Sequence, residues 1–211
     1  MKTMSSPHAP ISRATAWRLT AIMMVCSRYT GAASKHGHRY NHQMQAENFL
    51  IRVSIDEQRL LLLESGRVVM DVAVSTAANG PGEVMHSECT PRGRHRIRAK
   101  IGAGAAPNTV FVGRRDTGEV YTPELKAQHP NRDWMLTRIL WLCGMEPGHN
   151  RFGARDSMRR YIYIHGCPEE DPMGIPSSHG CVKMRNAEVI ELFDRVPAGT
   201  EVLIQEAAFE D

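Results

Sequence analysis

The sequence predicts a mostly-β domain over about residues 46–206, and three observations support this prediction. Short runs rich in β-branched and aromatic residues recur along this stretch, Gly-, Pro- and Asn-rich segments separate them, and one amphipathic helical pattern stands near the end. The chain has 211 residues, of which 42% are hydrophobic and 23% are charged. Such a chain is long and apolar enough to bury one domain core.

Three strand-like runs open the domain, at residues 49–55, 59–64 and 67–74. The two polar breaks between them, residues 56–58 and 65–66, have the length of hairpin turns. We therefore expect three consecutive antiparallel strands.

The middle of the domain alternates loops and short strands. Pro91 disfavours the helical region for Thr90, so an extended turn is expected there. Residues 136–143 fit helix or strand, but Trp141 and the β-branched residues favour a strand. A hairpin with its turn at residues 116–118 is also expected. The expected strands are 95–99, 110–112, 119–121, 136–143 and 161–164, and the expected loops are 75–87, 101–108 and 146–150.

One helix and one strand complete the domain. Asn186 is a favourable N-cap for a helix over residues 187–195, and Pro197 with Gly199 ends it. The apolar stripe of this helix consists of Val189, Ile190, Leu192, Phe193 and Val196. A strand over residues 200–204 closes the domain, and residues 207–211 form a tail.

Residues 1–45 differ in composition from the rest and are expected to be a disordered leader or a signal segment. Arginines precede a short apolar patch over residues 19–26, which loosely resembles a secretory signal. Met44 is an alternative translation start. No stretch approaches the roughly 20 apolar residues that span a bilayer, so no integral membrane segment is expected.

Charge and cysteine content exclude several classes of protein. The net charge of +3, with no cluster of Lys and Arg, gives no reason to expect a nucleic-acid partner. An odd number of cysteines leaves at least one unpaired within the chain, and no C-x-x-C spacing indicates a redox pair or a zinc ribbon. The cysteines are Cys26, Cys89, Cys143, Cys167 and Cys181.

The most informative stretch is residues 161–184, where a buried strand is expected to end at His165 and a loop to return the chain at Cys181. This arrangement suits a thiolate nucleophile and a base that takes its proton. Gly180 permits a tight backbone that can aim the Cys181 amide at an oxyanion. Nearby imidazoles would lower the pKa of the thiol.

Other interpretations of these residues stay open. A single cysteine is more often a small buried apolar side chain, and a single histidine is usually a hydrogen-bonded core residue. His179 competes as the base, although sequence neighbours on an extended chain point to opposite sides. The repeated His-Gly-Cys also allows a zinc-stabilised binding module, with His165, Cys167, His179 and Cys181 as ligands. No acidic third member is obvious, so a backbone carbonyl is expected to orient His165.

Together these motifs resemble the L,D-transpeptidase catalytic domain of the YkuD type. The resemblance rests on the Ser-His-Gly-Cys at residues 178–181 with Met184 and Asn186, and on the Tyr-Ile-His-Gly that ends at Gly166. Thr90-Pro-x-Gly93 and the opening strands up to Ser75 are also similar, so it covers about residues 46–206.

The resemblance implies an L,D-transpeptidase-like β-sandwich with one or two short helices, the main one after the catalytic cysteine. It implies a cysteine acyl transfer from a peptidoglycan tetrapeptide stem, with release of D-alanine, to an amine acceptor. Cys181 would be the nucleophile and His165 the proton donor and acceptor, while Gly180, His179 and Ser178 would form the oxyanion hole and pocket. A carboxypeptidase or Cys-His peptidase of the cell wall, with water as acceptor, is the alternative enzyme.

The resemblance also implies covalent binding of carbapenems and no metal or cofactor. Stem peptides are the expected partners, a monomer the expected state, and the periplasm or cell envelope the expected location. Lys183 stands where the family usually has arginine, and with Gly166 it is a candidate substrate-binding residue. A lysine in place of the arginine would weaken a contact of this side chain to a substrate carboxylate or to the loop between His165 and Cys181. Cys167 replaces a commoner small residue and raises the possibility of a Cys167–Cys181 disulfide.

Overall fold

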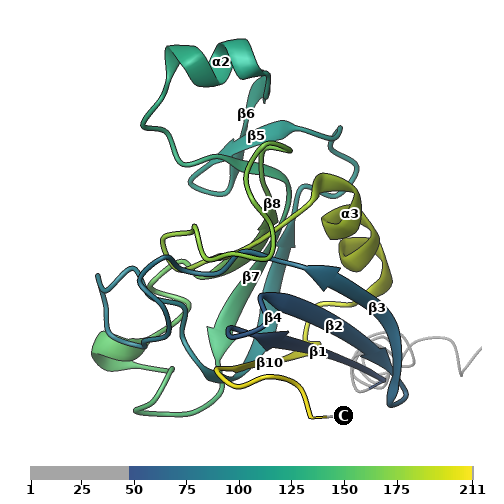
Figure 1. Ribbon diagram of the computed structural model, residues 1–211, viewed down its shortest axis with the longest axis vertical. Helices are drawn as coiled ribbons and strands as arrows, with labels where there is room; N and C mark the ends of the chain where they lie inside the picture. Colours follow the sequence, from purple (N-terminus) through teal and green to yellow (C-terminus); the bar gives the residue numbers. More distant parts are fainter. Residues whose placement is uncertain (1–47, 211) are drawn as a thin grey trace, which may run out of the picture. The chain divides into compact units, whose positions relative to one another are not determined.

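The computed structural model describes residues 48–210 and confirms the mostly-β class (Figure 1). The predicted leader and the alternative start at Met44 lie outside this range. The strands are β1 (Phe49–Ser54), β2 (Arg59–Glu64), β3 (Arg67–Ala73), β4 (Gly93–Ile101), β5 (Thr109–Val112), β6 (Arg115–Val120), β7 (Met135–Gly144), β8 (Tyr163–Gly166), β9 (Val182–Met184) and β10 (Glu201–Gln205). The helical elements are α2 (Pro123–Gln128), α3 (Asn186–Arg195) and the 3-10 turn η1 (Gly153–Arg155).

All ten strands belong to one hydrogen-bonded sheet, in the order β3-β2-β1-β10-β4-β7-β5-β6, with β8 paired to β7 and β9 paired to β8. The first and last strands are parallel neighbours, with Leu50 opposite Glu201. β8 and β9 are also parallel, with Ile164 opposite Val182.

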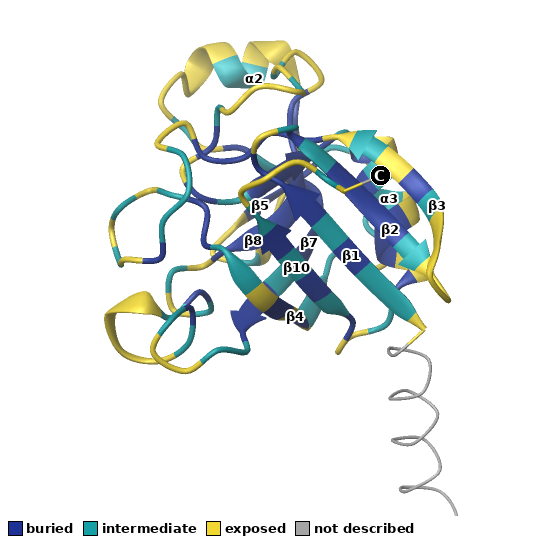
Figure 2. Cartoon of the chain, turned by 60° about the horizontal axis from the view of Figure 1, so that its bottom comes forward, coloured by how far each residue is buried: buried dark blue, intermediate teal, exposed yellow. Residues whose placement is uncertain are grey.

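The main core lies between distant parts of this sheet, so the two layers of the predicted sandwich belong to one continuous sheet. One cluster contains buried side chains of β1, β2 and β10 together with those of β7, β8, β9 and α3. Figure 2 shows these strands largely buried, whereas the connecting loops are mostly exposed. The largest fully buried side chains include Leu60, Leu62, Leu142, Ile164 and Met184. None of the helices in residues 48–210 has the length and apolar character needed to cross a membrane.

Helix α3 follows Cys181 closely in the sequence as predicted, but its N-cap differs. Arg185 is the N-cap and Asn186 the first helical residue, and the Glu188 carboxylate accepts a 3.3 Å hydrogen bond from the Arg185 backbone N–H. Asn186 is therefore free to use its side chain elsewhere. Val189, Leu192 and Phe193 of the predicted stripe are buried.

The sequence analysis differs from the structure at two further places. The β5–β6 hairpin turns at Gly113 and Arg114, not at residues 116–118, which lie within β6. Both turn residues have positive φ, as a two-residue hairpin turn requires. The sequence analysis also missed α2, although its signal is present: the Thr122 side chain accepts from the Leu125 N–H, and Pro123 opens the helix.

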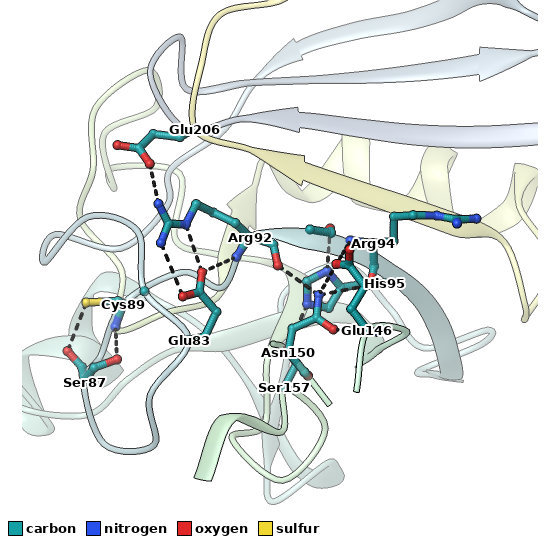
Figure 3. A network of polar contacts seen from close by, with 12 residues as sticks. Glu83, Ser87, Cys89, Arg92, Arg94, His95, Glu146, Asn150, Ser157 and Glu206 are labelled. Atoms are coloured by element: carbon teal, nitrogen blue, oxygen red, sulfur yellow. Dashed lines mark hydrogen bonds and ion pairs between the residues drawn. The ribbon is translucent and has the colours of Figure 1, made fainter. Parts of the chain in front are cut away.

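A polar network fixes the loop that leads into β4 (Figure 3). Arg92 donates to Glu83 at 2.9 Å and to Glu206 at 2.6 Å. Glu206 directly follows β10, so Arg92 connects the loop to the end of that strand. A Cβ on Gly93, whose φ is +91°, would stand 2.0 Å from the Glu146 carboxylate. This close approach explains the glycine of the Thr90-Pro-x-Gly93 segment.

Candidate functional site

Strand alternation separates the core from the candidate site. Ile164, Val182 and Met184 point into the main core. Their neighbours on β8 and β9 point to the opposite face, where Tyr163 and Cys181 pack in a second cluster with Phe111. His165 lies opposite Lys183 on this face. From the register, the Cα atoms of His165 and Cys181 are roughly 8 Å apart.

A backbone carbonyl orients His165, as the sequence analysis predicts. The imidazole Nδ1 lies 2.8 Å from the Gly166 carbonyl oxygen, and the side chain is buried. A carbonyl only accepts, so Nδ1 carries the proton and Nε2 of the neutral ring is the basic nitrogen. Burial lowers the pKa of His165 below 6.5, although Asp133 and the Gly166 contact act in the opposite direction. The neutral imidazole is therefore ready to accept a proton.

The Cys181 thiol is held between two backbone groups. Its Sγ accepts from the Tyr163 N–H at 3.4 Å and donates to the Tyr161 carbonyl at 3.5 Å. Burial raises its pKa from 9.0 to about 12, outweighing the Tyr163 hydrogen bond and the positive charges of Lys183 and Arg160. The prediction of a lowered thiol pKa was wrong, because desolvation exceeds the effect of the neighbouring groups.

The turn before Cys181 is held by two hydroxyl groups. Ser178 Oγ accepts from the Gly180 N–H at 3.2 Å and donates to the Cys181 carbonyl at 2.6 Å. Thr90 Oγ1 donates to the Gly180 carbonyl at 3.1 Å and accepts from the Ala77 N–H at 3.0 Å. In a trans peptide the C=O and the next N–H point in opposite directions. Thr90 therefore directs the Cys181 N–H away from itself.

This geometry refines the predicted oxyanion hole. The Gly180 N–H is occupied by Ser178, whereas the Cys181 N–H donates to no acceptor within residues 48–210. Gly180 has a φ of +120°, and an added Cβ would lie 3.2 Å from the Cys89 carbonyl oxygen. The Cys181 amide is therefore the donor best placed to bind an oxyanion.

The other predicted site residues have different positions. Lys183 is buried, and its Nζ lies 3.1 Å from Asp171, so its ammonium binds the loop after β8. A Cβ on Gly166 would stand 2.5 Å from the Asn186 side chain, so this glycine permits close packing next to His165. His179 is exposed and lines a cavity of about 250 Å³ beside Tyr161.

The structure does not support a disulfide or a zinc site here. Tyr163 lies beside Cys181, whereas Cys167 is four residues further along the chain, where its N–H donates to the Met184 carbonyl. That offset corresponds to about 13 Å along the strand, beyond the roughly 7 Å that a disulfide allows between Cα atoms. All four described cysteines are free thiols. Within residues 48–210 no group of three or more His, Cys, Asp or Glu side chains is arranged to hold a metal ion.

The sequence analysis missed several residues around this pair. Asp133 raises the pKa values of both His165 and Cys181, and the half-buried Arg160 lowers that of Cys181. The Thr90 hydroxyl was also missed, although its segment was noted. Thr90 and Asp133 lie far from positions 165–181 in the sequence, whereas Arg160 directly precedes the stretch but belongs to no recognisable motif.

The Asn186 side chain connects the helix to the candidate site. Its amide donates to the Cys167 carbonyl at 2.9 Å, and its Oδ1 accepts from the Thr137 hydroxyl at 2.5 Å. It thereby joins α3, β7 and the end of β8, the strand that carries His165. This position accounts for the asparagine five residues after Cys181.

The molecule is a mostly-β domain that carries a histidine on β8 and a cysteine directly before β9, the parallel neighbour of β8. It belongs to the L,D-transpeptidase catalytic-domain family, whose YkuD model matches residues 48–204. Membership in this family implies an enzyme.

Shorter matches connect the chain to curated relatives. It is 43% identical over 53 residues to "Putative L,D-transpeptidase YqjB" of Bacillus subtilis, covering 25% of this chain and 30% of that one. It is 44% identical over 43 residues to "Probable L,D-transpeptidase YbiS" of Escherichia coli, covering 20% and 14%. The matched segments thus span less than a third of each relative.

Solved structures also align with the chain. The L,D-transpeptidase of Xylanimonas cellulosilytica aligns with a TM-score of 0.43 and 22% identity, over 75% of this chain and 60% of that one. L,D-transpeptidase 3 of Mycobacterium tuberculosis aligns with a TM-score of 0.48 and 16% identity, over 75% and 61%.

Proposed function

We propose that the protein is a peptidoglycan L,D-transpeptidase that transfers an acyl group from a tetrapeptide stem to an amine acceptor. Family membership supports the reaction class. The observation that carries the assignment of roles is the Nδ1–H of His165 on the Gly166 carbonyl, on the same sheet face as Cys181. This contact leaves Nε2 as the base.

In the first half of the reaction, His165 Nε2 takes the thiol proton as Cys181 Sγ attacks the carbonyl carbon before the terminal D-alanine. The C=O bond becomes a C–O⁻ bond, and the Cys181 N–H binds the negative charge. The tetrahedral intermediate collapses, the C–N bond breaks, and His165 protonates the departing amine. A thioester on Cys181 remains.

In the second half, the amine of another stem attacks the thioester and gives its proton to His165. The C–S bond breaks, the new amide forms, and Cys181 recovers its proton. Water in place of the amine would give a carboxypeptidase.

The reaction requires access to the cell wall, so we propose that the protein works in the periplasm or an equivalent envelope compartment. N-terminal sequencing of the mature protein from its native host would test this. A new N-terminus within residues 1–45, in the envelope fraction, would support export, whereas an intact N-terminus in the cytoplasmic fraction would contradict it.

Intact-protein mass spectrometry tests the chemistry. The wild-type protein should gain one acyl group from a tetrapeptide stem and one adduct from a carbapenem, and the Cys181→Ala variant should gain neither. Equal labelling of both proteins would show that another thiol reacts. Chromatography of the products, with and without an added amine acceptor, then separates transpeptidation from hydrolysis to a tripeptide.

A further inference from the structure

A second cavity, which combines apolar and basic side chains, lies near the candidate nucleophile. It has a volume of about 650 Å³, and its lining includes Arg114, Trp141, Arg159, Tyr161 and His86. Within the described residues no Asp or Glu side chain lines it. A cavity with two arginines and no acidic lining favours an anionic ligand.

Arg114 is positioned by aromatic rings. Its guanidinium lies 4.5 Å from the Trp141 ring centroid and 4.9 Å from that of Tyr161, and its Nη1 donates to the Tyr163 hydroxyl at 3.0 Å. The hairpin turn that carries Arg114 sets the direction from which it enters. In residues 48–210 no carboxylate forms a salt bridge with Arg114. Its remaining N–H donors are suited to a carboxylate, which a planar guanidinium binds with two parallel hydrogen bonds.

The two tyrosines place this cavity beside Cys181. The Tyr163 backbone N–H donates to Cys181 Sγ, and its hydroxyl accepts from Arg114. The Tyr161 carbonyl accepts from the thiol, and Tyr161, which is 54% exposed, lines the cavity. A ligand bound at Arg114 is therefore about one tyrosine side chain away from the reacting sulfur.

We infer that Arg114, on the platform of Trp141 and Tyr161, binds a free carboxylate of the peptide substrate. This inference rests on the proposed function, since stem peptides carry a C-terminal carboxylate and, where the third residue is diaminopimelate, a side-chain carboxylate. Both sources present the same chemistry to the guanidinium. Arg114 would then determine substrate specificity without taking part in bond breaking.

The test measures binding, separately from catalysis. Calorimetry with the full-length Cys181→Ala protein compares three tetrapeptides: the free acid, the C-terminal amide and the side-chain amide of the third residue. The free acid should bind on the order of 10- to 100-fold more tightly than the amide that lacks the recognised carboxylate. The amide that loses affinity identifies which carboxylate is bound.

Three further substitutions in the same background sharpen the result. Arg114→Met should reduce this ratio to about one, and Arg114→Lys should retain part of it, since a lysine keeps the charge without the fork. Arg115→Met is the matched control, because Arg115 is exposed, adjacent in sequence and outside the cavity lining. Arg115→Met should preserve the ratio of affinities measured with the Cys181→Ala protein.

Equal affinity for all three peptides, no binding of any, or discrimination that persists in Arg114→Met would overturn the inference. The acyl-enzyme measurement on the wild-type protein is independent. An acyl-enzyme without discrimination would remove the carboxylate site and leave the proposed function intact. Discrimination without an acyl-enzyme would keep the carboxylate site and refute the reaction.

Discussion

Replacing Thr90 by valine should impair acylation although Thr90 contacts no reacting atom. Valine has nearly the same shape, so the substitution removes the hydroxyl with little change in packing. The Thr90 hydroxyl joins the Ala77 N–H to the Gly180 carbonyl, and both residues are buried. Without it, the Gly180–Cys181 peptide plane loses the contact that directs the Cys181 N–H.

The size of the effect follows from these two hydrogen bonds. Each buried group left without a partner costs about 1–3 kcal/mol, so the free energy of unfolding should fall by about 2–4 kcal/mol when partial relaxation is allowed. Loss of one oxyanion donor reduces a rate by roughly 10²–10³-fold. Because the Cys181 N–H is misdirected rather than deleted, a decrease of about 10–100-fold in the acylation rate is expected.

Two measurements on the same protein separate the effects. Urea unfolding gives the loss of stability, and time-resolved mass spectrometry of the carbapenem adduct gives the acylation rate under conditions where the circular dichroism is native. Thr90→Ser keeps the hydroxyl and should retain most of the rate. A folded Thr90→Val protein that acylates at the wild-type rate would refute the orienting role, and stability alone would then explain Thr90.

Other consequences of the structure can be tested similarly. His165→Ala should lower turnover by about 10²–10⁴-fold, because the variant lacks the general acid and base. A variant that turns over at the wild-type rate would contradict the assignment of His165 as the base. Iodoacetamide should alkylate Cys181 slowly at pH 8 and faster as the pH rises further, because the pKa of the thiol is raised to about 12; peptide mapping separates this reaction from that of Cys89, and a plateau near pH 8 would contradict the raised pKa. Burial lowers the pKa of His95 to about 4 in the native state, so below the unfolded value of 6.5 the unfolded chain binds a proton that the native protein does not. Stability should therefore fall by about 3 kcal/mol between pH 6.5 and 4, and His95→Gln should lack this component in urea unfolding.

The identities of the central residues could be predicted because they lie within one short stretch. The apolar run before His165, the Pro- and Gly-rich loop and the glycine before Cys181 together specify a strand, a return and a tight turn. That a backbone carbonyl orients His165 could be expected from the lack of an acidic partner, and the structure identifies it as the Gly166 carbonyl. These features depend on local backbone geometry, which neighbouring residues determine.

The electrostatics of the site could not be predicted in the same way. The thiol pKa depends on how much water the fold excludes from Cys181, and the Thr90, Asp133 and Arg160 contacts join positions far apart in the sequence. The displaced hairpin turn has a different cause. Asp116, Thr117 and Gly118 have turn composition, but Gly113 and Arg114 adopt the positive φ values that close the two-residue turn.

The parallel pairing of β1 with β10 makes the centre of the sheet depend on residues at opposite ends of the domain. Leu50 pairs with Glu201, so the middle of the sheet is incomplete until the last strand has been synthesised. Contacts this distant in sequence slow folding, because a long chain segment must close before any of them forms. A chain interrupted before β10 would leave the edges of β1 and β4 unpaired and open to association with other strands.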